Sequence, residues 1–446
     1  MDLRIPADVA DAIARLHGAG HEAYVVGGCV RDALRGVEPE DWDVATDAKP
    51  PRIQELFRRS VYRNRFGAVV GKTRVRESEI TTYRLEAGYS DARRPDAVEF
   101  TGSLLADLSR RDFTMNAMAW RPGPAELVDP HGGSADLERR IVRAVGDPDE
   151  RFREDALRML RAVRFATVLR MDIETATADA IVRSAPLAAV LSGERVQQEL
   201  TKILLAERTS VGVRMLSELK LLAVLCPELE LCRTIPQDKA VAQDVFEHSL
   251  ITVDAAPPDL VLRLAALFHD VGKPETFADG HFHQHEFVGE HLARQILRRW
   301  HYSKDTITAV AHLIRHHMFW YQDHWTESAV RRFIRKVGLE TIPALFALRR
   351  ADNIGSGARS PRMYALEQLW ERVEEEIQRA TARSPRDLVI DGHDVMQELG
   401  IPPGPEVGRI IKELFERVLD DPDLNVRETL LAEARRIHAA GAAGDG

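Results

Sequence analysis

The sequence predicts an α+β fold, in which an N-terminal α/β head around a mixed sheet is followed by an entirely helical region. In the first 145 residues, strand-like runs alternate with short helical segments, at 22–26, 43–45, 68–75, 80–84 and 97–100. From Arg151 onward, apolar residues recur at helical spacing, with helices expected at 153–169, 176–184, 193–205 and 211–219.

Breaks in these patterns divide the 446 residues into four expected domains, which are a head (1–145), a helical neck (146–235), a histidine-rich helical domain (236–355) and a C-terminal helical tail (356–446). Residues 236–239 are typical of a linker, and 353–357 interrupt the helical pattern. Further helices are expected at 363–379, 404–420 and 426–440, with disorder over 439–446.

Two motifs near the N-terminus indicate phosphate chemistry. Gly28 and Arg31 belong to a glycine turn that leads into a helix, an arrangement that holds triphosphates. Asp41 and Asp43 point to the same side if residues 42–45 form a strand, and two such carboxylates hold two Mg²⁺ ions for an in-line attack on a phosphate. Either motif alone is more often structural, but the pair in this order favours nucleotidyl transfer.

A third motif concerns base selection. The helical period over 154–165 places Asp155 and Arg158 at positions i and i+3, on one helix face. One interpretation is an ordinary intrahelical ion pair. The other is a protein template, because a carboxylate accepts from an exocyclic amine and a guanidinium donates to a ring nitrogen. Cytosine and adenine match that pattern, whereas uracil and guanine would leave buried polar groups unpaired.

These motifs, with segments 110–118 and 154–166, resemble a bacterial class II tRNA nucleotidyltransferase of the poly(A) polymerase superfamily, over residues 1–205. Such an enzyme adds CCA to tRNA without a nucleic-acid template, so the resemblance implies tRNA, CTP and ATP as partners. Residues 89–96 resemble the head loop of members that add the terminal A.

The resemblance also implies roles for individual residues. Asp41 and Asp43 would be catalytic and bind Mg²⁺, with Glu79 either a third carboxylate near the metals or an exposed strand residue. The expected nucleotide-binding residues are Gly28 and Arg31 for the triphosphate, Arg111 and Asp112 for phosphates and ribose, Asp155 and Arg158 for the base, and Arg161 and Arg164 for the phosphates.

A second site is predicted between residues 248 and 324, which hold 11 of the 16 histidines. An apolar helix presents His269 and Asp270 at its carboxyl end, and with His248 upstream and Asp352 downstream this resembles an HD-family metal phosphohydrolase. These four residues would bind a divalent transition metal of unknown identity.

His285 is a further candidate ligand, together with one of His316 and His317. Because adjacent helical residues diverge by about 100°, only one of the latter two faces a metal, and His317 is preferred.

Composition fits a cytoplasmic enzyme. No signal peptide or membrane span is expected, and the three cysteines (Cys29, Cys226 and Cys232) have no metal-binding spacing and an odd count. Net charge is −9, but RNA binding depends on local charge, for which 298–304, 331–336 and 349–350 are candidates. No obligate protein partner is evident.

Three alternatives stay open. The enzyme could add only the terminal A, could be a poly(A) polymerase, or could act primarily as a metal-dependent HD phosphohydrolase. The first two use the same base template, and the third is disfavoured by the intact head motifs.

Overall fold

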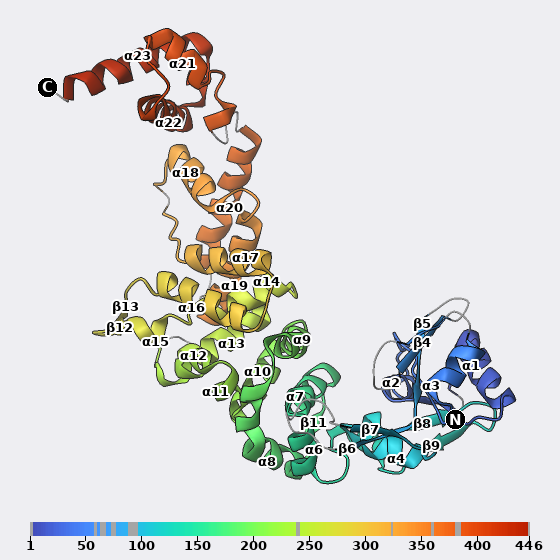
Figure 1. Ribbon diagram of the computed structural model, residues 1–446. Coiled ribbons are helices and arrows are strands. Elements are labelled where there is room, and N and C mark those ends of the chain that lie inside the picture. The colour runs from blue at the N-terminus through green and yellow to red at the C-terminus, as the bar shows by residue number, and fades with distance from the viewer. Residues whose placement is uncertain are drawn as a thin grey trace. The chain divides into compact units, whose positions relative to one another are not determined.

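The computed structural model describes residues 3–57, 60–62, 68–72, 77–87, 97–237, 241–322, 324–357, 361–379 and 385–444 (Figure 1). The chain forms two compact units. Unit 1 comprises Met1–Ile235, Pro258–Arg263 and Leu292–Ile307, and unit 2 comprises Pro236–Pro257, Leu264–His291 and Thr308–Gly446. The expected head loop at 89–96 and the end of the expected linker, 238–239, lie outside the described residues.

Unit 1 begins with a seven-stranded sheet in the order β3-β4-β5-β2-β1-β8-β9. Its strands are β1 (Ala23–Val26), β2 (Val44–Thr46), β3 (Ser60–Tyr62), β4 (Ala68–Lys72), β5 (Glu77–Thr82), β8 (Ala119–Arg121) and β9 (Glu126–Val128). Strands β2 and β5 pair in parallel and the other neighbours are antiparallel, which confirms the predicted mixed sheet. A separate hairpin joins β6 (Arg84–Ala87) to β7 (Ala97–Phe100).

Successive side chains of a strand point to opposite faces of the sheet, and apolar residues build a core on each face. In β1, Ala23 and Val25 enter one core and Tyr24 and Val26 enter the other. The first core also takes apolar residues from helices α1 (Ala7–Gly18), α2 (Gly28–Leu34) and α3 (Pro50–Leu56). The second takes Leu104 and Leu108 from α4 (Leu104–Ser109).

Helices follow the sheet, as predicted. The head also contains η1 (Thr114–Asn116), α5 (Gly133–Glu138) and β10 (Ile141–Val142), which pairs with β11 (Asp172–Ile173) of the neck. The neck helices are α6 (Pro148–Glu154), α7 (Leu157–Leu169), α8 (Thr175–Ser184), η2 (Ala185–Val190), α9 (Gly193–Leu204), α10 (Thr209–Glu218), α11 (Leu221–Leu225), α12 (Pro227–Leu231) and η3 (Cys232–Thr234). Helix α7 packs against α9 and α10. The single helix predicted at 153–169 is wrong, because the chain is extended at Asp155 and forms two helices.

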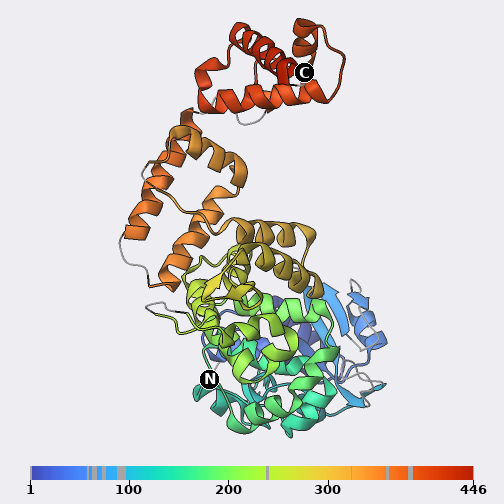
Figure 2. The same cartoon turned by 90° about the vertical axis from the view of Figure 1, so that its left-hand side faces the viewer.

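Unit 2 is helical apart from a small hairpin of β12 (Phe277–Ala278) and β13 (His281–Phe282). Its helices are α13 (Val245–Ala255), α15 (Lys273–Thr276), α18 (Glu327–Val337), α19 (Ile342–Gly355), α20 (Pro361–Arg379), α21 (Gly392–Leu399), α22 (Pro405–Asp420) and α23 (Arg427–Gly444), with η4 (Pro385–Asp387) and η5 (Pro422–Leu424). Helices α14 (Leu260–Phe268), α16 (His285–Arg299) and α17 (Lys304–His316) contribute residues to both units. Figure 2 shows α21–α23 as a bundle, which has its own apolar core.

Two expectations for unit 2 are wrong. Helix α19 continues through Asn353 to Gly355, where a break was expected. Helix α13 packs directly on α19 and supports this last turn. The close packing requires glycine at position 355, because a Cβ there would overlap Thr252 Oγ1. Helix α23 runs to Gly444, so residues 439–444 are helical rather than disordered.

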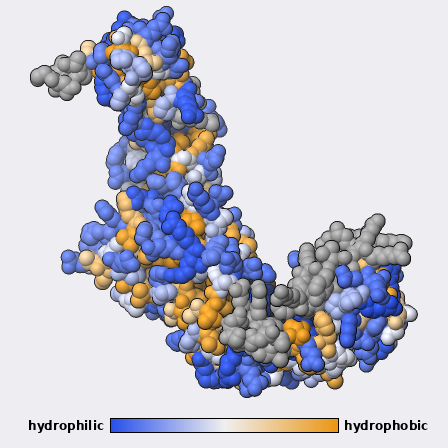
Figure 3. Space-filling model, viewed as in Figure 1, coloured by the Kyte–Doolittle hydropathy of each residue, from blue (hydrophilic) through white to orange (hydrophobic). Residues whose placement is uncertain are grey.

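Among the described residues, no helix combines the length and apolar character that crossing a membrane requires. On the face drawn in Figure 3, hydrophilic residues cover most of the coloured surface and hydrophobic ones form separate patches.

Candidate functional site

Three carboxylates meet where β2 and β5 begin. Trp42 is buried in the first core, whereas Asp43 is half-buried and Asp41 is exposed, and the Asp41 charge acts on Asp43. The parallel register of Val44 with Ile80 places Glu79 beside Asp43. Strand β2 starts at Val44, so both aspartates precede it rather than lying within a strand at 42–45, although the Asp43 carbonyl still accepts from Val26 N at 3.0 Å.

Ionisation of Asp43 is disfavoured in this carboxylate group. Burial raises the pKa of Asp43 to about 6, and the Glu79 and Asp41 carboxylates add to the rise while Arg111 opposes it. A carboxylate that is costly to ionise beside two others is a site where a cation binds favourably.

Arginine side chains lie against both residues of the glycine turn. Gly27 has φ of +81°, and a Cβ there would lie 2.8 Å from Arg111 Nη1. At Gly28, a Cβ would be 3.6 Å from Arg31 Nη2, so the Arg31 guanidinium lies against the turn. Nε and Nη2 of Arg31 donate to the Asp32 carboxylate at 2.9 and 2.6 Å.

Asn116 joins two of the predicted nucleotide-binding residues and was not predicted to have a role. Its Oδ1 accepts from Arg31 Nη1 at 2.8 Å, and its Nδ2 donates to Asp112 Oδ1 at 3.0 Å. Asp112 Oδ2 in turn accepts from Arg161 Nε and Nη2 at 2.8 and 2.5 Å. The signal in the sequence was an amide within the apolar run 115–120, because a buried amide needs partners.

These bonds set the charge state of Asp112. Burial alone would raise its pKa, but the Arg161 charge and the hydrogen bonds from Asn116 and Arg161 outweigh burial and lower the pKa to about 2.

Three guanidinium groups converge on Phe165, an aromatic residue of α7. The guanidinium carbons of Arg164, Arg31 and Arg161 lie 3.8, 5.2 and 5.5 Å from its ring centroid. Glu199 of α9 pairs with Arg164 at 2.5 Å. Arg31 of α2 and Arg161 and Arg164 of α7 thus form one basic cluster around Phe165. The other two predicted arginines, Arg111 and Arg158, are not part of it.

Asp155 and Arg158 do not share a helix face, contrary to the prediction, because α7 begins after Asp155. Asp155 Oδ1 accepts from Leu157 N at 3.0 Å and Oδ2 accepts from Arg195 Nη2 at 2.7 Å. Arg158 Nη1 donates to Glu154 Oε2 at 2.5 Å. Each residue is therefore held by its own protein partner rather than by the other.

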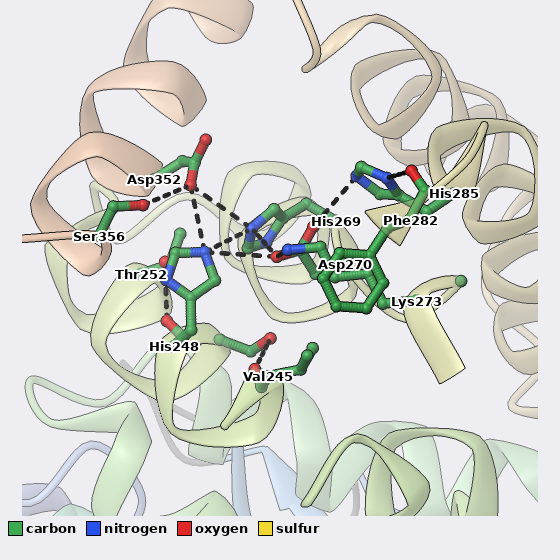
Figure 4. A network of polar contacts seen from close by, with 12 residues as sticks. Val245, His248, Thr252, His269, Asp270, Lys273, Phe282, His285, Asp352 and Ser356 are labelled. Atoms are coloured by element: carbon green, nitrogen blue, oxygen red, sulfur yellow. Dashed lines mark hydrogen bonds and ion pairs between the residues drawn. The ribbon is translucent and has the colours of Figure 1, made fainter. Parts of the chain in front are cut away.

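In unit 2, the six predicted metal ligands are buried together, and His317 rather than His316 is among them. They form the His/Asp cluster, which consists of a first triad (His248, His269, Asp352) and a second triad (Asp270, His285, His317), each with its ligand atoms within 4.8 Å of one another. Figure 4 shows His248, His269, Asp270, His285 and Asp352 facing one another.

Asp270 connects the two triads. Its Oδ2 lies 3.3 Å from His269 Nε2 and 3.4 Å from His248 Nε2. Its Oδ1 lies 3.3 Å from His285 Nε2 and 3.8 Å from His317 Nε2. One carboxylate thus faces both groups of imidazoles.

The imidazole nitrogens are arranged as metal ligands are. In three of the four rings, Nδ1 faces a backbone carbonyl oxygen, namely His269 with Ala266 at 2.8 Å, His285 with Phe282 at 3.3 Å and His317 with Ile314 at 2.7 Å. Such bonds leave Nε2 with its lone pair. Nε2 atoms of His248 and His269 are 3.0 Å apart, and those of His285 and His317 are 3.4 Å apart. Lone pairs so close repel unless a cation or a proton lies between them, so the residues fit one divalent ion per triad.

Charge states in the His/Asp cluster agree with this fit. Burial lowers the pKa of His317 to about 3, which keeps its ring neutral. The pKa of Asp270 is held well below its usual range by His269 and Lys273, in spite of burial. Lys273 Nζ donates to Asp270 Oδ2 at 2.5 Å, and Arg349 Nη1 donates to Asp352 Oδ2 at 2.6 Å.

Most arginines of the segments considered for RNA binding pair with carboxylates of their own unit. The ion pairs are Arg299 with Glu228, Arg331 with Glu376, Arg332 with Asp420, Arg335 with Glu416 and Arg349 with Asp352. The first four pairs join different helices, and Arg349 and Asp352 pair within α19.

Three family profiles match the chain. A profile described as the poly A polymerase head domain matches residues 23–143, one described as a probable RNA and SrmB-binding site of polymerase A matches 170–232, and one described as a putative tRNA nucleotidyltransferase domain 2 matches 286–434.

Whole proteins are similar as well. The chain is 32% identical to a CCA-adding enzyme of Limosilactobacillus reuteri, with 96% of each chain covered, and 34% identical to one of Anoxybacillus flavithermus, with 94% of each covered. Among solved structures, the Bacillus stearothermophilus CCA-adding enzyme in complex with CTP is similar with a TM-score of 0.74, at 27% identity and 98% coverage of both chains.

Proposed function

Because the chain belongs to the CCA-adding enzyme family, we propose that it adds C and A nucleotides to tRNA 3′ ends from CTP and ATP, without a nucleic-acid template. In this reaction the terminal hydroxyl oxygen attacks the α-phosphorus, the bond to the β-phosphate oxygen breaks, and pyrophosphate leaves. The observation that carries the proposal is the pairing, in unit 1, of a carboxylate group with a buried cluster of arginines.

Asp41, Asp43 and Glu79 are the residues that would hold Mg²⁺. Bound Mg²⁺ would polarise the α-phosphate and lower the pKa of the attacking hydroxyl. The raised pKa of Asp43 supports this role, since a cation relieves the repulsion among the three carboxylates.

Arg31, Arg111, Arg161 and Arg164 would hold the triphosphate. Guanidinium groups bind phosphate oxygens through paired hydrogen bonds. Asn116 and Asp112 fix the directions of Arg31 and Arg161, so little side-chain entropy is lost when the nucleotide binds.

Asp155 and Arg158 would select the base. Their selection does not require a shared helix face, because Arg195 and Glu154 already orient the two groups. The exocyclic amine of C or A would donate to the Asp155 carboxylate, and the ring nitrogen would accept from the Arg158 guanidinium.

Incubation with tRNA lacking three, two or one terminal nucleotides, with CTP and ATP singly and together, tests the proposal. We expect CTP alone to extend the first substrate by two nucleotides and ATP to complete each substrate that ends in CC. Extension of only the CC-ending tRNA would indicate an A-adding enzyme, and repeated ATP incorporation would indicate a poly(A) polymerase.

We also propose that the His/Asp cluster is a phosphohydrolase site for two divalent transition metal ions. Bound ions would activate water and neutralise phosphate charge. Water adds to phosphorus, the P–O bond to the alcohol breaks, and the alcohol oxygen takes a proton. Asp270 would orient both triads, and Lys273 and Arg349 would add positive charge at the phosphate.

Metal content and hydrolysis test this second function. The full chain loaded with Mn²⁺, Co²⁺ or Ni²⁺ should bind two ions and hydrolyse phosphate monoesters or diesters. A chain that binds no transition metal with His269 and Asp270 intact would exclude it.

A further inference from the structure

A cavity of about 250 Å³ lies next to the His/Asp cluster and has no role in the functions above. Phe319, Trp320 and Tyr321 form one wall, which begins two residues after His317 of the second triad in the chain. Arg349 and Asn353 of α19 form another, one on each side of Asp352, and helix α20 completes the lining.

The cavity touches the metal ligands through Arg349. Its Nη1 donates to Asp352 Oδ2 at 2.6 Å, while Asp352 Oδ1 faces His248 Nε2 at 3.1 Å. The same guanidinium lies 5.8 Å from the Phe319 ring centroid. One side chain therefore borders both the candidate metal site and the aromatic wall.

Packing holds the aromatic wall in place. Phe319 contacts Phe333 and Phe346, with ring centroids 5.2 and 5.5 Å apart. Arg372 donates to Tyr321 Oη at 3.2 Å. Trp320 differs from its neighbours, because 59% of its surface is exposed although it is a large aromatic residue at the cavity.

We propose that this cavity binds the base of a nucleoside phosphate ester whose phosphate lies at the His/Asp cluster. Bases stack on aromatic rings irrespective of sequence, and the Arg349 guanidinium and the buried Asn353 amide offer donors and an acceptor for a base edge. A cavity just below the usual range of about 300–1,000 Å³ suits one nucleoside rather than an oligonucleotide. The substrate class of the site is thus the nucleoside phosphates, an inference that rests on the proposed phosphohydrolase.

The test compares full-length, metal-loaded wild type with Trp320→Ala and Trp320→Phe. Tyr364→Ala is the control, since Tyr364 is equally exposed, at 61%, and does not line the cavity. The probes are AMP and UMP, with ribose 5-phosphate as a phosphate ester without a base. Binding is measured by calorimetry and hydrolysis by phosphate release. The head site is the same in all four proteins, so differences among them report the cavity.

We expect Trp320→Ala to weaken binding of AMP and UMP about tenfold, as loss of a base–aromatic stack does. Trp320→Phe should retain most of the affinity, and Tyr364→Ala and the ribose 5-phosphate affinity should stay unchanged. Melting temperatures close to wild type would establish that the variants are folded.

Two results separate the inference from the function it rests on. Equal nucleotide binding by wild type and Trp320→Ala, with hydrolysis intact, would overturn the base site and leave the phosphohydrolase. Trp320-dependent binding without hydrolysis of any ester would retain the base site and overturn the phosphohydrolase.

Discussion

Asn116 shows how a single amide organises the candidate transferase site. It accepts from Arg31 and donates to Asp112, and Asp112 accepts from Arg161. An amide accepts from a cation through its oxygen and donates to an anion through its nitrogen without changing charge. The positions of two phosphate-binding candidates, from α2 and α7, therefore depend on this residue of η1.

At the carboxylate group, Asp43→Ala should reduce nucleotide addition to CC-ending tRNA about a thousandfold, because removing a metal-binding carboxylate removes several kcal/mol of transition-state stabilisation. Incorporation of labelled ATP measures the effect. Asp47→Ala is the matched control, since Asp47 follows β2 and accepts from Glu22 N. Addition by Asp43→Ala within a few-fold of wild type would remove Asp43 from the metal site.

Asp112 predicts a pH dependence of stability. Its pKa is about 2 in the folded chain and about 3.9 when unfolded. Folding therefore favours the ionised form of Asp112. This preference contributes up to about 2 kcal/mol to the free energy of unfolding above pH 5, and the contribution is lost as pH falls toward 2. Urea unfolding should give a destabilised Asp112→Asn whose deficit against wild type shrinks between pH 5 and pH 3.5. A deficit that is constant with pH would contradict the assigned charge interaction.

At the scale of elements, junctions between helices position the reactive groups. The chain is extended at Asp155 between α6 and α7, and the carboxylate then caps Leu157 and meets Arg195 of α9. In unit 2, His269 and Asp270 follow the end of α14, and His317 follows the end of α17. Helix ends thus place these three of the six cluster residues, while His248 and Asp352 come from the interiors of α13 and α19.

The junction at Asp155 predicts a change of specificity. Asp155→Ala should admit UTP and GTP relative to CTP, because the group that rejects them is removed, and the rate with CTP should fall as well. Competition assays on tRNA lacking CCA measure the ratio. Glu150→Ala, on the neighbouring helix α6, is the control. Unchanged selectivity at a lower rate would indicate that Asp155 has a capping role only.

Close packing of α13 on α19 predicts a stability effect. A Cβ at Gly355 would overlap Thr252 Oγ1 and lie 3.1 Å from the His248 ring. Gly355→Ala should therefore destabilise unit 2 by about 1–3 kcal/mol and weaken metal binding. Gly408→Ala, in an exposed turn of α22 with nothing within 4 Å, should instead be neutral or stabilising. Thermal melts of apo and metal-loaded protein compare the two; similar melts would refute tight packing at Gly355.

For the whole molecule, the two candidate sites lie in different compact units and use different donors. The carboxylates of unit 1 provide only oxygen, which suits Mg²⁺, and unit 2 provides imidazole nitrogen as well, which suits transition metals. Because the two functions depend on separate residues and separate ions, a substitution that abolishes one function should leave the other intact.

The double variant His269→Ala with Asp270→Ala should lose transition-metal binding and phosphate-ester hydrolysis while nucleotide addition stays within about twofold, as additivity of independent sites implies. Metal analysis, hydrolysis and incorporation on one preparation measure this. Since lost metal ligands can destabilise a domain, a melting curve accompanies the assays. A folded variant that lost addition would make the His/Asp cluster part of the transferase.

The sequence by itself determined the features that depend on backbone period and local order. It predicted the mixed sheet, the helical remainder, and the position of His269 and Asp270 at a helix end. These features follow from the side-chain period of two residues in strands and 3.6 residues in helices. That period can be recognised from neighbouring residues alone. The assigned roles of the site residues stay predictions.

Only the tertiary structure decided which distant residues meet. It joined Arg31 to Asp112 through Asn116, divided six ligands into two triads around Asp270, and interrupted the expected helix at Asp155. It also kept α19 helical to Gly355, where glycine and polar residues predicted a break. The reason is physical: a distance between residues far apart in sequence is set by how helices pack, and buried polar groups require partners that local sequence does not specify.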